Sequence, residues 1–116
     1  MNALTNNTKK VDCSLHDNVN IKQNKKENLI HLLKDKVEKS IIDGKAIIII
    51  SRHSFMEYRN TLYVEDYEID PFHLYLNENN FEAHITFTDT TEIKYDNTYD
   101  ESFVVRDKDS EVTLIF

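Results

Sequence analysis

The sequence predicts an α+β fold, with one N-terminal amphipathic helix packed on a mainly antiparallel, strongly bent sheet or small barrel of about six strands. Two observations lead to this prediction. Apolar residues recur at a helical period over residues 25–43, and after residue 46 they alternate at a period of two in short segments separated by polar clusters. The length of 116 residues suits one domain with a single core.

Residues 1–23 form a polar segment, rich in Asn, Lys, Asp and Ser, in which the few apolar residues follow no period. Such a composition does not bury enough surface to offset the entropy lost on ordering. We therefore predict a flexible polar arm over residues 1–23 and a single α+β domain over residues 24–116. The one cysteine, Cys13, excludes an internal disulfide and a cysteine-rich zinc site.

The helix is predicted over residues 25–43. Asn24 and Glu27 have the spacing of a capping box at its start, and Gly44 supplies a left-handed stop at its end. An apolar residue recurs every fourth position along the helix, at Leu29, Leu33, Val37 and Ile41. This spacing produces one apolar face that packs against the sheet.

The strands follow the helix. The uninterrupted β-branched run Ala46–Ile50 predicts a central strand covered on both faces. Half-buried strands are predicted where apolar and polar residues alternate, over Leu62–Glu65, Phe72–Leu76 and Phe81–Phe87, with shorter strands near residues 92–95, 102–105 and 111–116.

One hairpin is predicted with its tip at Asn77–Asn80. An even-numbered loop there pairs Leu76 with Phe81, Leu74 with Ala83 and Phe72 with Ile85. The same register places His73 opposite His84 and Tyr75 opposite Glu82 on the other face. Two facing imidazoles beside a carboxylate are weak candidates for a zinc site or a pH sensor, and an exposed cross-strand pair is the simpler interpretation.

Charge is divided unevenly along the chain. Residues 1–50 carry nine lysines and six acids, a net charge of +3, whereas residues 51–116 carry five basic residues and fifteen acids, a net charge of −10. All Tyr and Phe residues also follow Ser54. The strand region therefore projects a negative field, and its natural partners are basic clefts.

These features predict a non-enzymatic acidic protein that inhibits or regulates a basic, nucleic-acid-binding partner. Carboxylates take the positions of phosphates in the partner's groove, and tyrosines act as anchors. Phage-encoded nuclease inhibitors such as anti-CRISPR proteins, and immunity proteins, are similar in charge and size alone. The expected contact residues are Glu65, Asp66, Tyr67, Glu68, Asp70, Tyr75, Glu82, Tyr95, Asp96, Tyr99 and Asp100. We expect no direct nucleic-acid or membrane binding, no cofactor and a cytoplasmic location.

Two alternatives remain open. A leading helix followed by short strands is the order of Sm-like and SH3-like barrels, which bind RNA or peptides. Glu92 and Lys94, with Asp70 or Asp89, have the residue types of a metal-dependent nuclease. A single glycine excludes Gly-rich phosphate-binding loops, so nucleotide chemistry by those routes is not expected.

Overall fold

The described part of the protein contains one helix and eight strands, so the fold is α+β as predicted. The computed structural model describes the backbone from Ser14 and the side chains from Lys25. The helix, α2, spans Ser14–Asp43 and therefore begins earlier than the predicted capping box. Residues 14–23, which the composition predicts as an arm, belong to α2, whereas residues 1–13 lie outside the described residues. The helix is therefore not the N-terminal segment of the chain.

The C-terminal end of α2 is where the sequence predicts it. Gly44 has a φ of 65°, the left-handed conformation that glycine adopts without steric cost. Its N–H donates to the carbonyl of Ile41 at 3.2 Å, and the N–H of Lys45 donates to the carbonyl of Ser40 at 2.9 Å. This pair of bonds is a Schellman motif, which satisfies carbonyls at the helix end and turns the chain into the first strand.

The strands form two antiparallel sheets rather than one. The larger sheet has the order β2-β1-β8-β7-β6 and the smaller has the order β3-β4-β5. The strands are β1 (Ile47–His53), β2 (Met56–Leu62), β3 (Asp66–Ile69), β4 (His73–Glu78), β5 (Phe81–Thr86), β6 (Glu92–Asp96), β7 (Ser102–Asp107) and β8 (Ser110–Ile115). Over the described residues neither sheet closes into a barrel, so the predicted single bent sheet or small barrel of about six strands is wrong.

Two of the eight strands differ from the pattern expected for half-buried strands, β2 because it does not alternate and β3 because it is very short. Only Leu62 is buried in β2, at its last residue, because the rest of this edge strand extends beyond the core. The alternation predicted for Leu62–Glu65 therefore belongs to the end of β2 and the connection that follows it. β3 is only four residues long, although its side chains alternate, with Asp66 and Glu68 exposed and Tyr67 and Ile69 on the inner face.

β1 differs from prediction in being covered on one face only. Ile47 and Ile49 are buried, whereas Ile48 and Ile50 are partly exposed on the outer face of the larger sheet. A buried face and a solvated face are typical of an antiparallel sheet, in contrast to the parallel arrangement in which both faces are covered.

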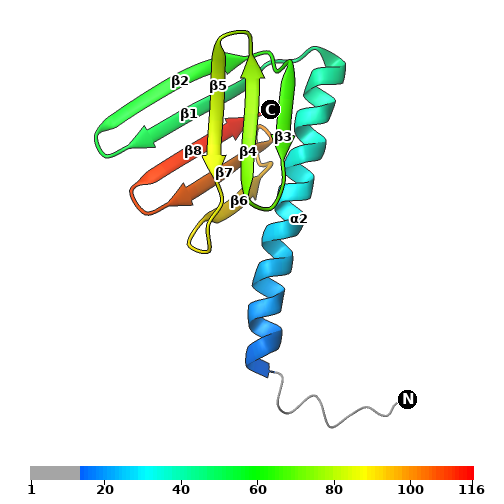
Figure 1. Cartoon of the computed structure of the whole chain (residues 1–116), viewed down its shortest axis with the longest axis vertical. Coiled ribbons are helices and arrows are strands. Elements are labelled where there is room, and N and C mark those ends of the chain that lie inside the picture. The colour runs from blue at the N-terminus through cyan, green and yellow to red at the C-terminus, as the bar shows by residue number, and fades with distance from the viewer. Residues whose placement is uncertain (1–13) are drawn as a thin grey trace.

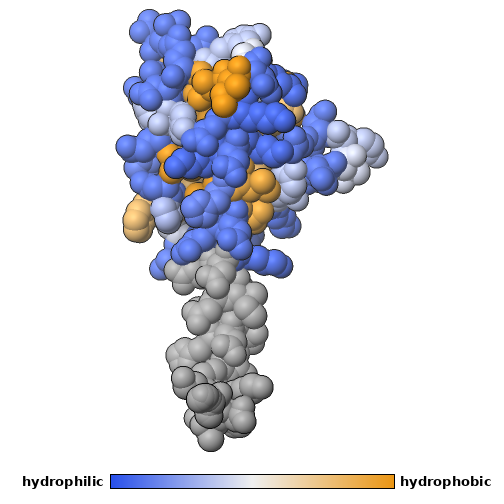
Figure 2. All heavy atoms as spheres, turned by 90° about the vertical axis from the view of Figure 1, so that its right-hand side faces the viewer, coloured by the Kyte–Doolittle hydropathy of each residue, from blue (hydrophilic) through white to orange (hydrophobic). Residues whose placement is uncertain are grey.

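One hydrophobic core lies between the two sheets and α2. Figure 1 shows the smaller sheet across the face of the larger one, with α2 along one side. Seen from that side, the surface is mostly hydrophilic, with separate hydrophobic groups (Figure 2). The helix contributes Ile30, Leu33 and Val37 to the core, and the strands and connections contribute Ile47, Ile49, Leu62, Val64, Ile69, Leu74, Leu76, Phe87, Phe103, Val105 and Leu114. Within the described residues, no helix is long and apolar enough to cross a membrane.

The β4–β5 hairpin has a different register from the predicted one. Glu78 pairs with Phe81, so the loop is only Asn79–Asn80, and Leu76 pairs with Ala83 instead of Phe81. The shift is by two residues, so every side chain stays on its predicted face. His73 consequently lies opposite Thr86, and Tyr75 lies opposite His84. The shorter loop is possible because Asn79 adopts a φ of 50°, a conformation that asparagine tolerates better than most residues.

A cluster of threonines attaches the β5–β6 connection to the end of β7. The hydroxyls of Thr88, Thr90 and Thr91 donate to the carboxylate of Asp107 at 2.8, 2.7 and 2.9 Å. The hydrogen bonds from Thr90, Thr88 and Thr91 favour the ionised form and lower the pKa of Asp107 below its usual value. This connection carries the chain from the smaller sheet to the larger one, so the cluster fixes the crossing.

The turn geometry predicts a specific stability change. We expect Asn79→Ala to lower the free energy of unfolding by about 1 kcal/mol, because alanine pays the full cost of the left-handed conformation. Asn79→Gly should preserve or raise stability. Asn80→Ala is the matched control, and chemical denaturation of the three variants checks the prediction. Equal losses for Asn79→Ala and Asn80→Ala would contradict the assigned turn.

The threonine cluster predicts a pH-dependent stability. Because the folded-state pKa of Asp107 is lowered, its contribution is fully present above the unfolded pKa of about 3.9 and is lost as pH falls through the folded pKa. Asp107→Asn should lower the melting temperature at neutral pH by roughly 5 °C, and the difference from the natural protein should shrink below about pH 4. Thermal unfolding between pH 3 and pH 7 measures this. Asp109→Asn removes a charge in the adjacent turn, and an identical profile for both variants would count against the cluster.

Candidate functional site

The outer face of the smaller sheet gathers polar side chains from three adjacent strands. Strand pairing and alternation place on it Asp66 and Glu68 of β3, His73, Tyr75 and Asn77 of β4, and Glu82, His84 and Thr86 of β5. We call this set the acidic face. The opposite side chains of the same strands, among them Ile69, Leu74 and Leu76, are buried in the core, and this burial fixes the orientation of the sheet.

The stretch of sequence that forms the acidic face contains no Lys or Arg that could neutralise its carboxylates. No Lys or Arg occurs between Arg59 and Lys94. Six acids lie in the part of that interval that builds the smaller sheet and its connections: Glu65, Asp66, Glu68, Asp70, Glu78 and Glu82. Among the described side chains, the ion pairs of Glu68 and Asp70 involve only the imidazole of His73. Among the described residues, the carboxylates of the acidic face therefore form no ion pair with Lys or Arg.

Hydrogen bonds hold several of these carboxylates in place. Asp70 Oδ1 accepts the backbone N–H of Phe72 at 2.8 Å and that of His73 at 3.0 Å, and these bonds lower the pKa of Asp70. The hydroxyl of Tyr75 donates to Glu82 Oε1 at 3.1 Å. Desolvation, followed by this bond to Glu82, raises the pKa of Tyr75, so its hydroxyl stays protonated and acts as a donor.

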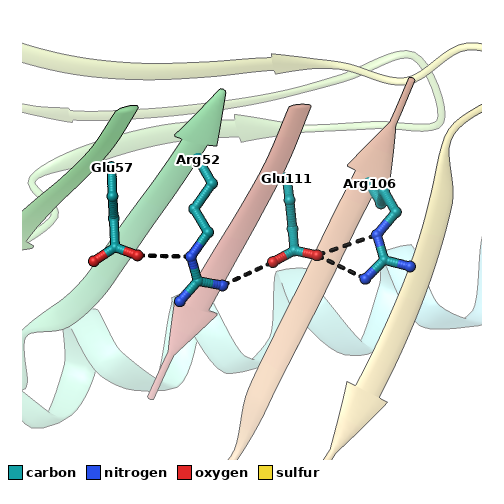
Figure 3. A network of polar contacts seen from close by, with 4 residues as sticks. All are labelled: Arg52, Glu57, Arg106 and Glu111. Atoms are coloured by element: carbon teal, nitrogen blue, oxygen red, sulfur yellow. Dashed lines mark hydrogen bonds and ion pairs between the residues drawn. The ribbon is translucent and has the colours of Figure 1, made fainter. Parts of the chain in front are cut away.

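The outer face of the larger sheet has the opposite character. Figure 3 shows a row of alternating charges across β2, β1, β8 and β7. Arg52 donates to Glu57 at 2.7 Å and to Glu111 at 2.9 Å, and Arg106 donates to Glu111 at 2.7 Å. The hydrogen bonds from Arg106 and Arg52 lower the pKa of Glu111. Carboxylates in this row are neutralised by the protein's own arginines.

The structure brings together about half of the predicted contact residues. Asp66, Glu68, Tyr75 and Glu82 lie on the acidic face, and Asp70 lies at its edge in the β3–β4 turn. Glu65 lies at the hairpin end of the smaller sheet, where its Oε1 accepts the N–H of Asn79 at 2.9 Å.

The remaining predicted contact residues lie elsewhere. Tyr67 is half-buried and donates to Glu38 of α2, and Tyr95 is half-buried and donates to Glu101 at 2.7 Å, so neither shows the expected exposure. In both cases the hydrogen bond to the carboxylate is the main cause that raises the tyrosine pKa. Three predicted contact residues belong to the end of β6 and the connection after it: Asp96, Tyr99 and Asp100.

Exposed aromatic side chains flank the acidic face. Phe72 lies in the β3–β4 turn and is 73% exposed, and Tyr63 is 57% exposed. The backbone N–H of Tyr63 donates to Glu78 Oε1 at 2.8 Å, which places this residue near the opposite, hairpin end of the smaller sheet. The alternation of residues 72–76 predicts that Phe72 faces the core, so only the structure identifies it as an exposed aromatic residue.

The residues of the nuclease alternative are divided between the sheets. Strand pairing places Glu92 opposite Arg106 and Lys94 opposite Val104, on the outer face of the larger sheet. Asp70 belongs to the smaller sheet, so it does not join them. Asp89 is exposed in the β5–β6 connection.

An apolar cleft opens between the two sheets beside β5. It has a volume of about 190 Å³, and Ile49, Leu74, Ile85 and Leu114 are among the residues that line it. Pockets that bind small molecules usually have volumes of roughly 300–1,000 Å³. This cleft is therefore smaller than the pockets that usually bind small molecules.

Comparison of the chain with protein-family models, with curated proteins and with solved structures finds no match.

Proposed function

We propose that this protein is a non-enzymatic acidic binding module that presents the acidic face to a basic groove of a nucleic-acid-binding partner, and thereby inhibits or regulates that partner. The observation that carries the proposal is the separation of charge between the two sheets. Carboxylates on the larger sheet are paired with Arg52 and Arg106, whereas those on the smaller sheet have no Lys or Arg nearby in the sequence.

The spacing of the acidic side chains supports this proposal. Asp66 and Glu68 are alternate residues of β3, where such residues lie about 7 Å apart, and Asp70 follows them in the β3–β4 turn. Glu82 extends the same field across the sheet from β5. A regular array of anionic groups suits a groove lined with Lys and Arg that otherwise accepts phosphates.

Aromatic residues supply the apolar part of the proposed contact. Phe72 and Tyr63 lie at opposite ends of the smaller sheet, and Tyr75 contributes a half-buried ring between them. Large rigid rings are enriched among residues that dominate binding energy. The exposed charge pairs across the contact then orient the partner and speed its association more than they strengthen its affinity.

Direct RNA binding by a barrel receives no support from the geometry. The sheets do not close, and two of the strand region's five basic residues, Arg52 and Arg106, are paired with glutamates. In a gel shift with mixed RNA and DNA, we expect no retention of nucleic acid at low salt.

The proposal predicts that reversing charge on the acidic face weakens partner binding. We expect Asp66→Lys with Glu82→Lys to lower affinity roughly tenfold or more for proteins captured from a nuclease-treated lysate, and added duplex DNA to compete with the natural protein. Raising the salt concentration should also release the captured proteins, because exposed charges are screened within about 10 Å at 0.1 M. Quantitative mass spectrometry measures capture.

The matched control is Asp43→Lys with Asp109→Lys, which changes the net charge equally at exposed sites outside the smaller sheet. This control should retain the captured partner. Equal loss with both double variants would show that overall charge, rather than the acidic face, determines binding. Capture that resists salt and both variants would indicate an apolar contact instead.

A further inference from the structure

Potential metal ligands converge where β3 turns into β4. Glu68, Asp70 and His73 each offer a ligand atom, and these atoms all lie within 4.8 Å of one another. Glu68 Oε1 is 2.6 Å from His73 Nε2, and Asp70 Oδ1 is 3.8 Å from His73 Nδ1. Metal binding by the histidines alone was a weak expectation from the sequence, and the turn adds two carboxylates to it.

The turn itself orders these groups. Asp70 Oδ1 accepts the N–H groups of Phe72 and His73, and the N–H of Asp70 donates to the carbonyl of His73 at 3.0 Å. These three bonds connect the end of β3 to the start of β4. The side chain of His73 is only 29% exposed, whereas that of Glu68 is 69% exposed. The imidazole is therefore held in place, and the glutamate is free to adjust to an ion.

His84, on the third strand, is a further candidate ligand beside the three whose ligand atoms converge. Its ring centroid lies 5.6 Å from that of His73, at an interplanar angle of 74°. In a tetrahedral zinc site, with Zn–N distances of about 2.0–2.1 Å, two ligating imidazoles have centroids about 5 Å apart. The observed separation is close to that value, and the exposed His84 side chain has room to rotate.

The surrounding charge favours a cation. Glu68 and Asp70 contribute two negative charges, and no Lys or Arg lies in the sequence between Arg59 and Lys94 to compensate them. Mixed imidazole and carboxylate ligands suit Zn²⁺ and related transition metals, whereas Mg²⁺ and Ca²⁺ prefer sites made of oxygen ligands alone.

We propose that Glu68, Asp70, His73 and His84 form a binding site for a divalent transition metal of the Zn²⁺ type on the acidic face. Three adjacent strands contribute to this site, so a bound ion would link β3, β4 and β5. The proposal goes beyond the docking function and does not rest on it, because metal binding is measured on the isolated protein without a partner.

The experiment titrates Zn²⁺ into the tag-free, chelator-treated full chain carrying Cys13→Ser, which removes the thiol as a competing ligand. We expect saturable uptake of one Zn²⁺ per chain by calorimetry, and intense visible absorption bands with Co²⁺ that Zn²⁺ abolishes. His73→Ala and His84→Ala should each weaken Zn²⁺ affinity about tenfold or more. A large excess of Mg²⁺ should not displace Zn²⁺.

Two other exposed histidines supply matched controls. His31→Ala and His53→Ala remove the same ligand type outside the site and should leave Zn²⁺ affinity unchanged. Glu68→Gln, a conservative change at an exposed position, should also weaken binding, which keeps the test decisive if a histidine variant folds poorly. Unchanged affinity in His73→Ala and Glu68→Gln, equal losses in the control variants, or the absence of saturable uptake would overturn the proposal.

Discussion

A single buried core between the two sheets and α2 determines which side chains every strand presents to solvent. Leu33, Leu74 and Phe103, one from each layer, are fully buried in it. Because side chains alternate along a strand, burial of one set requires exposure of the other. The acidic face and the row of alternating charges are therefore both consequences of how the same core is packed.

The two outer faces use similar residues in different ways. On the larger sheet, Glu111 lies between Arg52 and Arg106, and these contacts satisfy its charge within the protein. On the smaller sheet, the ion pairs of Glu68 and Asp70 are with an imidazole alone, and Asp70 also accepts two backbone N–H groups. An exposed carboxylate without a Lys or Arg partner interacts with an external cation at little desolvation cost, whereas one paired with Arg must first lose that partner. This difference is the reason we propose the smaller sheet, rather than the larger one, as the surface for basic partners and metal ions.

The proposed docking surface and the proposed metal site overlap at Glu68 and Asp70, whereas Asp66 and Glu82 belong to the docking surface alone. Asp66 and Glu82 lie in the same cross-strand row, through Asn77, at the hairpin half of the sheet. Glu68, Asp70 and His73 lie toward the β3–β4 turn. A bound divalent cation would reduce the negative field at that turn and leave the carboxylates of the hairpin half unchanged. Variants at Asp66 and Glu82 therefore test docking without removing a proposed metal ligand.

The sequence by itself determined the α+β class, the end of α2 at Gly44 and the inward and outward faces of β4 and β5, because periodicity and local backbone preference act over a few residues. The sequence did not predict β2, β3 or the division into two sheets. β2 is a polar edge strand that forms by pairing with its neighbour rather than by its own pattern, and β3 has only four residues in which to show one. The observed β4–β5 register differs from the predicted one by two residues, and every side chain keeps its predicted face. Alternation specifies only whether the register is odd or even, and the turn specifies its exact value. Neutralisation of Glu111 and convergence of Glu68 with His73 depend on distances between strands, which only the tertiary structure decides.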